Sequence, residues 1–522
     1  MLTATPAAPA AAPEDFCLFA HLKPTAFFQA LTRGESFVWV LAISLTLRLG
    51  LAAIMPFTAD EAYAVVVSRS HSLSYYDHPP LMFALARLMA DLTGSETPFY
   101  LRLPFVLMGT ASTAFLYDIT RQCFGARAGF WASAAFSVSP FFLTFGQLLI
   151  VPDGPLDLFL LISFWAMLPI LLHDKSSLLN WIIAGGALAF ALMSKYQAVL
   201  FGIGALLALI SDKKGRKHLM QPGCWIAFLI AALGLVPILV WNAQHDWISF
   251  TFQTARTYHS TRLITHLGNL VGVLMGQAIY LLPGVWLTAQ KAIWRGLKQA
   301  PTPSYRWLAM VGFLPILIFD LIGLVGHHSL PHWAMSGFLF ALPLVGDVRA
   351  RTEKASPKPL MRKLWLSGLI VSIVAILICL QSQTACLTRY LYKEAPRFDM
   401  GWQNLDWSSP AVDLPTQKGF IVTPDWVQAG HAGLAFGANH PILVLTDPHQ
   451  FQFMDQKSLS HTTTGYFIEA VPLDQRTHAM RTAMSGLSGQ YRITGSPVLS
   501  TQKRLGFPSF QLFIVPVEKR ID

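Results

Sequence analysis

The chain has 522 residues, of which 53% are hydrophobic and only 13% are charged. Soluble proteins carry about 25% charged residues, so this composition excludes an ordinary soluble enzyme and indicates a polytopic membrane protein. The formal net charge of +10 invites a nucleic-acid partner, but the basic residues gather in loops on one side of the predicted spans. They are therefore interpreted as topology signals, and nucleic-acid binding is not expected.

Residues 1–36 form an Ala/Pro-rich segment without the basic-then-apolar order of a signal peptide. We expect this segment to be cytoplasmic and the first apolar run to stay as an anchor. The five cysteines lie mostly in apolar runs or in segments predicted to face the cytoplasm, so no disulfide framework is expected. They are Cys17, Cys123, Cys224, Cys379 and Cys386.

Eleven apolar stretches are long enough, or nearly so, to cross a bilayer, which takes about 20 apolar residues. They are residues 37–56, 101–119, 128–147, 156–172, 178–194, 196–211, 223–241, 267–289, 307–326, 333–346 and 364–382. The pattern predicts an all-α polytopic membrane domain of about 11 transmembrane helices over residues 37–382.

The loop charges orient these spans. With the N-terminus inside, most loop Lys and Arg residues face the cytoplasm, as the positive-inside rule requires. The outer loops then hold few basic residues: Arg69, Arg87, Lys195, Arg256 and Arg262. This orientation predicts a multi-pass membrane protein with a cytoplasmic N-terminus and a first outer loop at 57–100, and it puts the unusual polar clusters on the outer face.

After about residue 383 the apolar runs shorten to strand length and turn-forming residues separate them. Strands are predicted at 419–422, 441–445, 465–468 and 510–515, with a helix at 425–436. Residues 383–522 are therefore expected to form a small extracytoplasmic α/β domain.

The acidic pair Asp60 and Glu61 follows the first span. With Thr58 it fits a capping box, in which Thr58 is the N-cap and Glu61 the third helical residue. Glu61 is thus equally well explained as a cap or as a site residue. The cap does not need Asp60, which lies at the positive end of the helix dipole and suits a general base.

The stretch 75–80 reads YYDHPP and precedes an apolar helix predicted from Leu81 to Leu92. Asp77 or His78 could simply cap that helix, and the tyrosines could be interface aromatics. We favour a functional interpretation for Tyr76, Asp77 and His78, because two tyrosines, an acid and an imidazole crowd into four positions.

Asp153 sits in a tight outer turn, PDGP, and Asp157 lies one turn into the next span. Turns commonly contain aspartate, so a structural role for Asp153 is a fair alternative. Lys195 lies at a span end on the outer side, against the positive-inside bias, which favours an anionic partner such as phosphate over simple snorkelling. Arg256 and Arg262 are the basic residues of the 242–266 loop and suit bidentate phosphate contacts.

Three histidines, His327, His328 and His332, lie close together in sequence. Their spacing is not that of a helical zinc pair and no nearby acid completes a site, so a metal is the less favoured interpretation. No cofactor is required by the sequence, although a divalent cation at the acidic cluster is left open.

The ordered set of motifs resembles the family 39 glycosyltransferases, which include protein O-mannosyltransferases and the lipid A aminoarabinose transferase. The motifs run from about residue 58 to 345: the Asp60-Glu61 pair, YYDHPPL at 75–81, RLP at 102–104, PDGP at 152–155, SKY at 194–196, WN at 241–242 and PHW at 331–333. Each is weak alone, and their order makes the resemblance specific.

The resemblance implies a C-type glycosyltransferase fold and an inverting transfer of a sugar from a polyprenyl phosphate to an envelope acceptor at the outer membrane face. The family's catalytic aspartate matches Asp60, and its further acidic positions match Asp77 and Asp153. Its phosphate-binding lysine matches Lys195, and an arginine of the large outer loop matches Arg256. The aminoarabinose transferase has lysine at the position of His78, so that particular sugar is not implied.

Two other classes compete with an enzyme. A transporter or flippase for a lipid-linked sugar would also place charges near the membrane, but its polar groups usually gather around the midplane between paired halves. A non-catalytic envelope scaffold would not need an ionised Asp60. The acceptor, whether glycolipid, lipid A, polysaccharide or protein, is not named by the sequence.

Overall fold

The computed structural model describes most of the chain, and the statements below concern the described residues. These are 35–211, 213–255, 263–325, 329–355, 366, 369–370, 372–374, 376–377, 419–437, 440–446, 448–454, 463–471, 487, 489–504 and 507–520. The predicted domain boundaries after residues 36 and 382 adjoin or fall in segments outside these ranges, so the division into domains stays a prediction.

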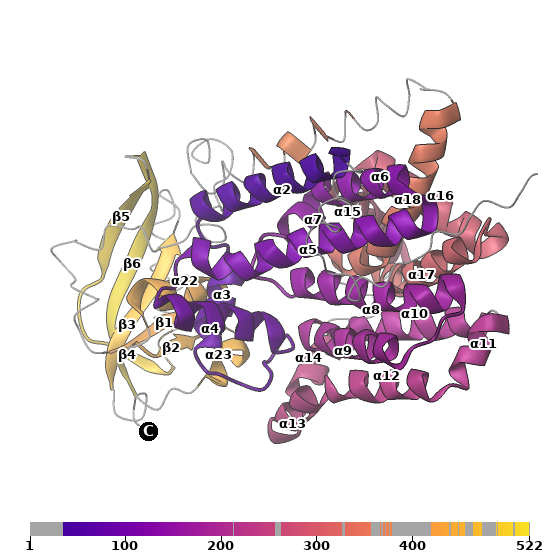
Figure 1. Ribbon diagram of the computed structural model, residues 1–522. Coiled ribbons are helices and arrows are strands. Elements are labelled where there is room, and N and C mark those ends of the chain that lie inside the picture. Colours follow the sequence, from indigo (N-terminus) through magenta and orange to yellow (C-terminus); the bar gives the residue numbers. More distant parts are fainter. Residues whose placement is uncertain are drawn as a thin grey trace, which may run out of the picture.

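Long helices form a bundle, and a β-sheet lies at one end of it (Figure 1). The helices of the bundle and its loops are α2 (Glu35–Ile54), α3 (Ala59–Ser68), α4 (Leu81–Thr93), α5 (Pro98–Phe124), α6 (Ala126–Val138), α7 (Pro140–Thr144), α8 (Asp153–His173), α9 (Leu178–Ser194), α10 (Ala198–Ser211), α11 (Lys213–Leu219), α12 (Pro222–Leu233), α13 (Val236–Gln244), α14 (Ile248–Ala255), α15 (Leu263–Leu281), α16 (Pro283–Gln299), α17 (Pro303–Val325), η1 (Pro331–Ala334) and α18 (Met335–Ala355). Helices satisfy their own backbone groups, which a lipid environment demands.

Within the described ranges, five helical stretches are long and apolar enough to cross a membrane. They are Phe37–Ile54, Pro98–Phe124, Asp153–His173, Pro222–Gln244 and Pro303–Val325. Helices α9 and α10 are apolar but shorter. The protein is thus a mostly helical, multi-pass membrane protein, whereas the predicted span 364–382 lies largely outside the described residues.

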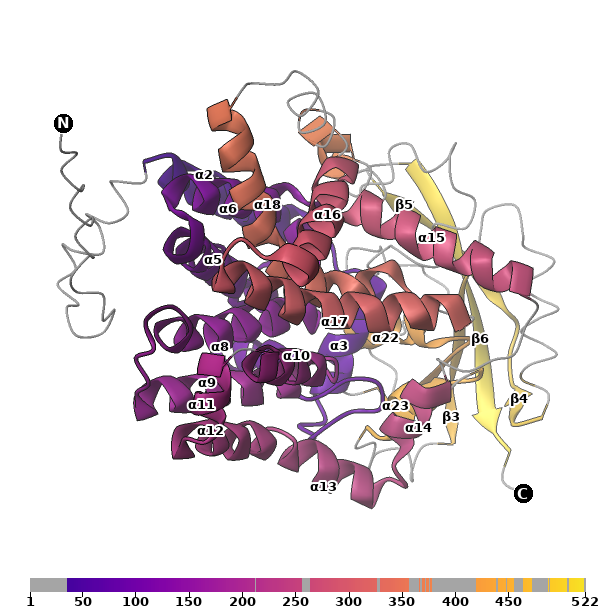
Figure 2. The same cartoon turned by 90° about the vertical axis from the view of Figure 1, so that its right-hand side faces the viewer.

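The span predicted at 267–289 is wrong as one continuous helix. Helices α15 and α16 meet at a bend of 109°, and they diverge in Figure 2. Leu282 adopts a positive φ of 72° immediately before Pro283. Proline disfavours the helical conformation in the residue before it and donates no backbone hydrogen bond, so the helix breaks at this point.

The helix predicted at 128–147 is also shorter than expected. Helix α6 ends at Val138, and α7 restarts at Pro140 for only five residues. Residues 145–152 then form an irregular but largely buried segment that leads into α8. Irregular backbone at membrane depth is tolerated where protein surrounds it, and this segment carries contacts to the site described below.

The C-terminal part contains a six-stranded mixed sheet with strand order β2-β1-β3-β6-β4, in which β5 pairs with β6. Its elements are β1 (Phe420–Thr423), α22 (Trp426–Phe436), β2 (Ile442–Val444), α23 (His449–Gln452), β3 (Thr464–Val471), β4 (Tyr491–Ile493), β5 (Val498–Arg504) and β6 (Phe507–Lys519). The expected strands at the positions of β1, β2, β3 and β6 are present, as is α22 with Asp425 as its N-cap. Strands β4 and β5 were not expected.

The two faces of the sheet bury different side chains, as the alternation of residues along a strand requires. Phe420 and Val422 pack on one face with Tyr491. Ile421, between them, points to the other face and joins a second apolar cluster with Ile468. Helix α22 covers this second face.

The segment 57–100 and the C-terminal sheet share one hydrophobic core. A single cluster of buried side chains contains Phe57, Val66 and Phe83 from this segment together with Ile421 and Leu512 from the sheet. Helix α22 lies directly against α3, as Figure 1 also shows. The two parts are therefore one packed unit at the end of the bundle, although more than 300 residues separate them in sequence.

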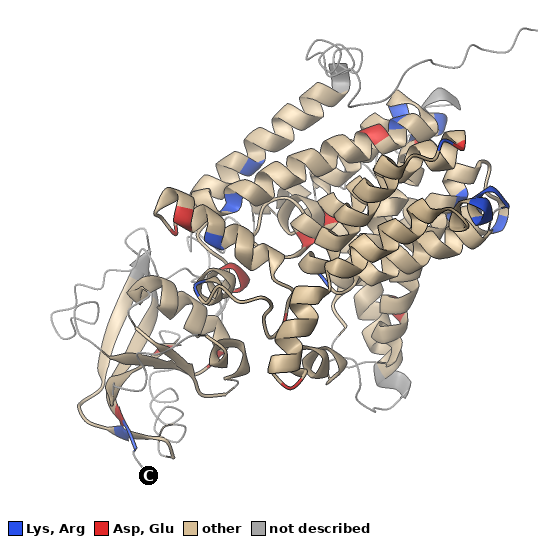
Figure 3. Ribbon diagram, turned by 60° about the horizontal axis from the view of Figure 1, so that its bottom comes forward, with Lys and Arg blue, Asp and Glu red and all other residues tan. Residues whose placement is uncertain are grey.

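The charges are distributed unevenly between the two ends of the molecule. Lys and Arg residues of α11 cluster at the end of the bundle that lies far from the sheet (Figure 3). This helix contains Lys213, Lys214, Arg216 and Lys217. The end beside the sheet carries the acidic motifs and only a few basic residues.

Candidate active site

The N-terminus of α3 shows the predicted capping box. The Thr58 hydroxyl accepts a hydrogen bond from the Glu61 backbone N–H, and Glu61 Oε2 accepts one from the Thr58 backbone N–H. Glu61 is completely buried and also forms a bidentate ion pair with Arg102, with distances of 2.7 and 2.6 Å. Its Oε1 accepts a further hydrogen bond from the Ile150 backbone N–H. These contacts are those of a residue that fixes α3 to its surroundings.

Asp60 differs from its neighbour because its side chain is exposed at the first turn of α3. The positive end of the helix dipole favours its ionised form. An exposed carboxylate can reach a substrate, which the buried and saturated Glu61 cannot do without losing Arg102. Of the two carboxylates, Asp60 is therefore the exposed one, and Glu61 is the one engaged in structural contacts.

Asp77 is nearly buried and accepts a hydrogen bond of 2.8 Å from the Tyr63 hydroxyl. Burial, followed by the charge of Asp77 and this hydrogen bond, raises the pKa of Tyr63 well above its usual value. The phenol thus stays protonated and acts as a donor to the carboxylate. His78 Nε2 lies 3.8 Å from the other Asp77 oxygen.

Neither Asp77 nor His78 caps the helix that follows. The N-cap of α4 is Pro80, and it makes no side-chain capping hydrogen bond. The interpretation of Asp77 or His78 as the cap of that helix is therefore wrong. Asp77 is instead bound to α3, which brings the two acidic motifs of the segment together.

Helix α14 holds the stretch 75–77 from the other side. Gln253 donates a 2.7 Å hydrogen bond to the Asp77 carbonyl, and Ser249 donates one of 2.9 Å to the Tyr75 carbonyl. The rings of Tyr76 and Phe252 lie 4.5 Å apart. The chain enters the predicted arginine-bearing loop directly after α14, but Arg256 and Arg262 themselves lie outside the described residues.

Lys195 and Asp153 form a buried ion pair, with Nζ and Oδ1 2.8 Å apart. Lys195 follows the end of α9 and Asp153 begins α8, so the pair joins the ends of two consecutive, adjacent helices. Asp157 is buried nearby, within electrostatic range of both. An ammonium group has three donors, so Lys195 retains hydrogen-bonding capacity toward an anion beyond its bond to Asp153.

Two links connect this ion pair to the acidic segment. Glu61 binds Ile150, three residues before Asp153. Tyr196, which follows Lys195, lies within electrostatic range of Asp77. Asp60, Asp77, Asp153 and Lys195 therefore belong to one region at the end of the bundle that faces the sheet.

His332 lies in η1, and its ring stacks on Phe145 and Phe141 at 5.9 and 6.3 Å between centroids. It thus packs beside the segment that leads to the Asp153 turn. Across the part of the chain that the structure describes, no three His, Cys, Asp or Glu side chains gather closely enough to hold a metal ion. His327 and His328 lie outside that part.

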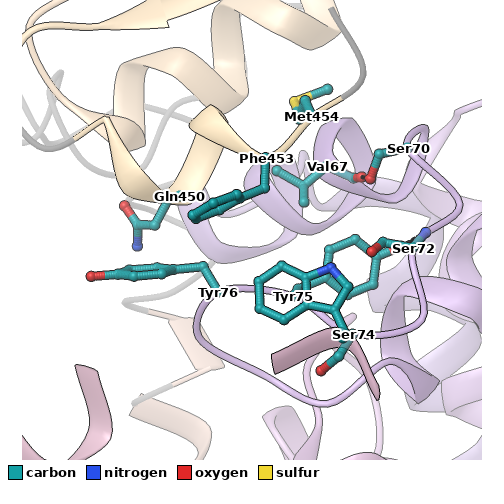
Figure 4. Close-up of a pocket in the computed structure, with 10 residues that line it drawn as sticks. Val67, Ser70, Ser72, Ser74, Tyr75, Tyr76, Gln450, Phe453 and Met454 are labelled. Carbon is teal, nitrogen blue, oxygen red and sulfur yellow. Dashed lines mark hydrogen bonds between the residues drawn. The ribbon is translucent and has the colours of Figure 1, made fainter. Parts of the chain in front are cut away.

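A narrow cleft runs between the segment 57–100 and the C-terminal unit. Figure 4 shows Phe453, Gln450 and Met454 facing Tyr75 and Tyr76 across it. The ring of Tyr76 also stacks on His449 of α23 at 5.5 Å. Tyr76 thus lies at the contact between the two parts, one residue away from Asp77.

Two buried residues were not singled out from the sequence, Tyr63 of the acidic region and Arg48 of α2. Tyr63 has no motif signal, because its partner Asp77 is 14 residues away and meets it only in the fold. Arg48 is fully buried in α2, where it bonds to Ser44. A charge inside the first apolar run was a visible signal, because intramembrane arginines are rare and often functional.

Comparisons with known proteins support the motif-based resemblance. The family model of dolichyl-phosphate-mannose-protein mannosyltransferases matches residues 77–241, a range that includes Asp77, Asp153 and Lys195. The lipid A galacturonosyltransferase RgtD of Rhizobium johnstonii is 24% identical over 284 residues, which are 54% of this chain and 58% of that protein. The aligned region thus spans little more than half of this curated relative.

The fold matches that of ArnT from Cupriavidus metallidurans. The crystal structure with bound undecaprenyl phosphate has a TM-score of 0.61 at 13% identity, over 92% of this chain and 97% of that chain. The apo structure gives a TM-score of 0.60 at 12% identity, over 94% and 98%. Together these matches confirm the resemblance to the family 39 glycosyltransferases that the sequence motifs predicted, and the ArnT structures show the shared fold.

Proposed function

We propose that the protein transfers a sugar, with inversion, from a polyprenyl-phosphate donor to an envelope acceptor at the outer face of the bacterial inner membrane. The observation that carries this proposal is the gathering of Asp60, Asp77 and the Lys195–Asp153 ion pair at one end of the bundle. Acids for an acceptor and a cation for a phosphate are the groups that such a reaction needs.

In this proposal Asp60 takes the proton from the acceptor hydroxyl or amine as that atom attacks the anomeric carbon. The bond from that carbon to the phosphate oxygen breaks through an oxocarbenium-like transition state. Negative charge accumulates on the departing polyprenyl phosphate, where Lys195 stabilises it together with Arg256 and Arg262. Tyr76, Asp77, His78, Asp153 and His332 are proposed to bind substrate, and Glu61 to hold α3.

The names of the relatives support the substrate classes. The solved ArnT structure contains undecaprenyl phosphate, which agrees with a polyprenyl-phosphate donor. The curated relative is a lipid A galacturonosyltransferase, which favours a glycolipid such as lipid A among the acceptors left open by the sequence. The basic helix α11 and the sheet lie at opposite ends of the bundle (Figure 3), which by the positive-inside rule supports a cytoplasmic α11 and an outer C-terminal unit.

The test is transfer of radiolabelled sugar from a polyprenyl-phosphate donor to envelope glycolipid in membranes that contain the protein. Wild type is expected to form labelled glycolipid, and Asp60→Asn is expected to form none while it inserts at the same level. A flippase would move the donor lipid across vesicles without forming product. Full turnover by Asp60→Asn would overturn the general-base assignment.

A further inference from the structure

Two glycines of α22 allow the C-terminal unit to approach α3 very closely. A Cβ at Gly430 would lie 2.6 Å from the Tyr63 backbone nitrogen, and one at Gly433 would lie 2.8 Å from both methyl groups of Val66. Arg69 adds a 3.0 Å hydrogen bond to the Gly433 carbonyl. The backbone of α3 cannot give way at Gly430 without moving the helix that carries Asp60.

Tyr63 is the residue of α3 that connects this contact to the acidic site. Its ring is packed edge-on by Trp426 of α22 and lies close to Phe451 of α23, both at 5.7 Å between centroids. On the other side it meets Phe83 of α4 at 6.2 Å. The Tyr63 hydroxyl lies beyond these rings and donates a 2.8 Å hydrogen bond to the Asp77 carboxylate.

The ring is thus fixed by the C-terminal unit, and the hydroxyl fixes Asp77. An aromatic side chain enclosed on several sides has one available rotamer, so the direction of its hydroxyl depends on the surrounding rings. Because Asp77 is nearly buried, a lost hydrogen bond from Tyr63 would not be replaced freely by water.

We propose that Tyr63 is a positioning residue, through which the C-terminal unit holds Asp77 in the geometry needed for transfer. The inference rests on the proposed function, since it assigns the C-terminal unit a role in the same reaction. It gives that unit an indirect part in the reaction, because the unit positions Tyr63 and Tyr63 positions Asp77.

The first experiment compares Tyr63→Phe with Tyr491→Phe in the full-length protein. Tyr63→Phe keeps the packed ring and removes only the hydroxyl, so kcat/KM is expected to fall by about 10-fold at an unchanged level of folded protein. Tyr491 is a buried tyrosine of β4 on the opposite face of the sheet. Its substitution is expected to leave kcat/KM within twofold of wild type.

A double-mutant cycle separates positioning from general damage. If Tyr63 acts through Asp77, Tyr63→Phe and Asp77→Asn should lower kcat/KM for the same substrate. The double variant should then have a kcat/KM only slightly below that of Asp77→Asn alone. A double variant whose fold loss in kcat/KM equals the product of the two single losses would overturn the inference. So would wild-type kinetics for Tyr63→Phe in an active enzyme, whereas an inactive wild type would instead overturn the proposed function.

The second experiment tests the path through α22. Gly430→Ala is expected to lower kcat/KM because its methyl group displaces α3. Gly489→Ala is the control in the same unit: its methyl group meets nothing within 4 Å, so kcat/KM is expected to stay unchanged. The double variant Gly430→Ala with Tyr63→Phe should lose less kcat/KM than the product of the two single fold losses. Equal activity of the Gly430 and Gly489 variants would contradict the proposed path.

Discussion

Neighbouring residues of one motif have different surroundings, and these surroundings separate their roles. Glu61 is buried, with both oxygens engaged by Arg102, while Asp60 is exposed on the next position of the same helical turn. Lys195 is likewise defined by its partner, because its buried ion pair with Asp153 prevents an uncompensated charge at the edge of the spans. A phosphate donor would add to this pair as a third charged group.

The Lys195–Asp153 pair leads to a prediction about donor use. Lys195→Ala should raise the donor KM by about 10-fold or more, since a charge-assisted bond to phosphate is lost. The acceptor KM should change much less. Steady-state kinetics with each substrate varied in turn measures both, and the exposed Lys217→Ala variant on α11 is the matched control.

Lys195→Ala also leaves Asp153 buried without its cation, which could lower activity through unfolding alone. The double variant Lys195→Ala with Asp153→Asn removes that charge and should regain thermal stability. It should still show the raised donor KM. Recovery of normal donor KM in the double variant would show that Lys195 serves only to neutralise Asp153.

At the scale of elements, α3 is held by three different neighbours. The Glu61–Arg102 ion pair binds the N-terminus of α3 to α5, and the hydrogen bond from Ile150 binds α3 to the segment before α8. Helix α22 packs its glycines against the middle of α3. A ten-residue helix is only marginally stable alone, so these contacts decide its position. The helix that bears Asp60 is therefore fixed by both the bundle and the C-terminal unit.

The ion pair between α3 and α5 gives a stability prediction. Glu61→Gln leaves the fully buried Arg102 without its carboxylate, which should cost about 3–5 kcal/mol of the free energy of unfolding. Thermal unfolding of the purified protein in detergent measures this loss as a lowered midpoint. Asp91→Asn, which breaks an exposed ion pair with Arg87, is the control and should have little effect. Equal midpoints for both variants would contradict the structural role of Glu61.

At the scale of the whole molecule, one apolar core joins the segment 57–100 to the C-terminal sheet. An ion network lies at its border, where Glu96 binds Arg69 and Arg87, and Arg69 also bonds to Gly433 of α22. Burial alone would raise the pKa of Glu96, but hydrogen bonds and charges from Arg69 and Arg87 lower it below its usual value. The lowered pKa of Glu96 therefore predicts that acid weakens the contact between the two parts.

The sign of this effect follows from the lowered pKa. Stabilisation by ionised Glu96 is fully present above the pKa of the unfolded chain, about 4.3, and is lost as the pH falls through the lower folded-state value. Glu96→Gln should thus lower the unfolding midpoint at pH 7, and the difference from wild type should shrink on acidification toward pH 3. A difference that stays constant over this range would rule out the ionised network as its source.

Much of the fold and of the candidate site could be predicted from the sequence because the signals are local. Long apolar runs specify helices, the TADE sequence specifies the capping box at Thr58, and short apolar runs between turn-forming residues specify β1 and β3. The break between α15 and α16 was missed, although Pro283 marked it, because the hydropathy continues across it. Strands β4 and β5 carry mostly partly exposed side chains and give a weak pattern.

Composition and short-range spacing were enough to identify the membrane-embedded helical class, the acidic motifs in their order, and the family resemblance that these motifs support. Three contacts became visible in the folded structure alone. Glu61 forms an ion pair with Arg102, Lys195 forms one with Asp153, and Tyr63 contacts both Asp77 and the C-terminal unit. These contacts join residues from 14 to several hundred positions apart. No local pattern encodes them, since they arise only when separate helices pack together.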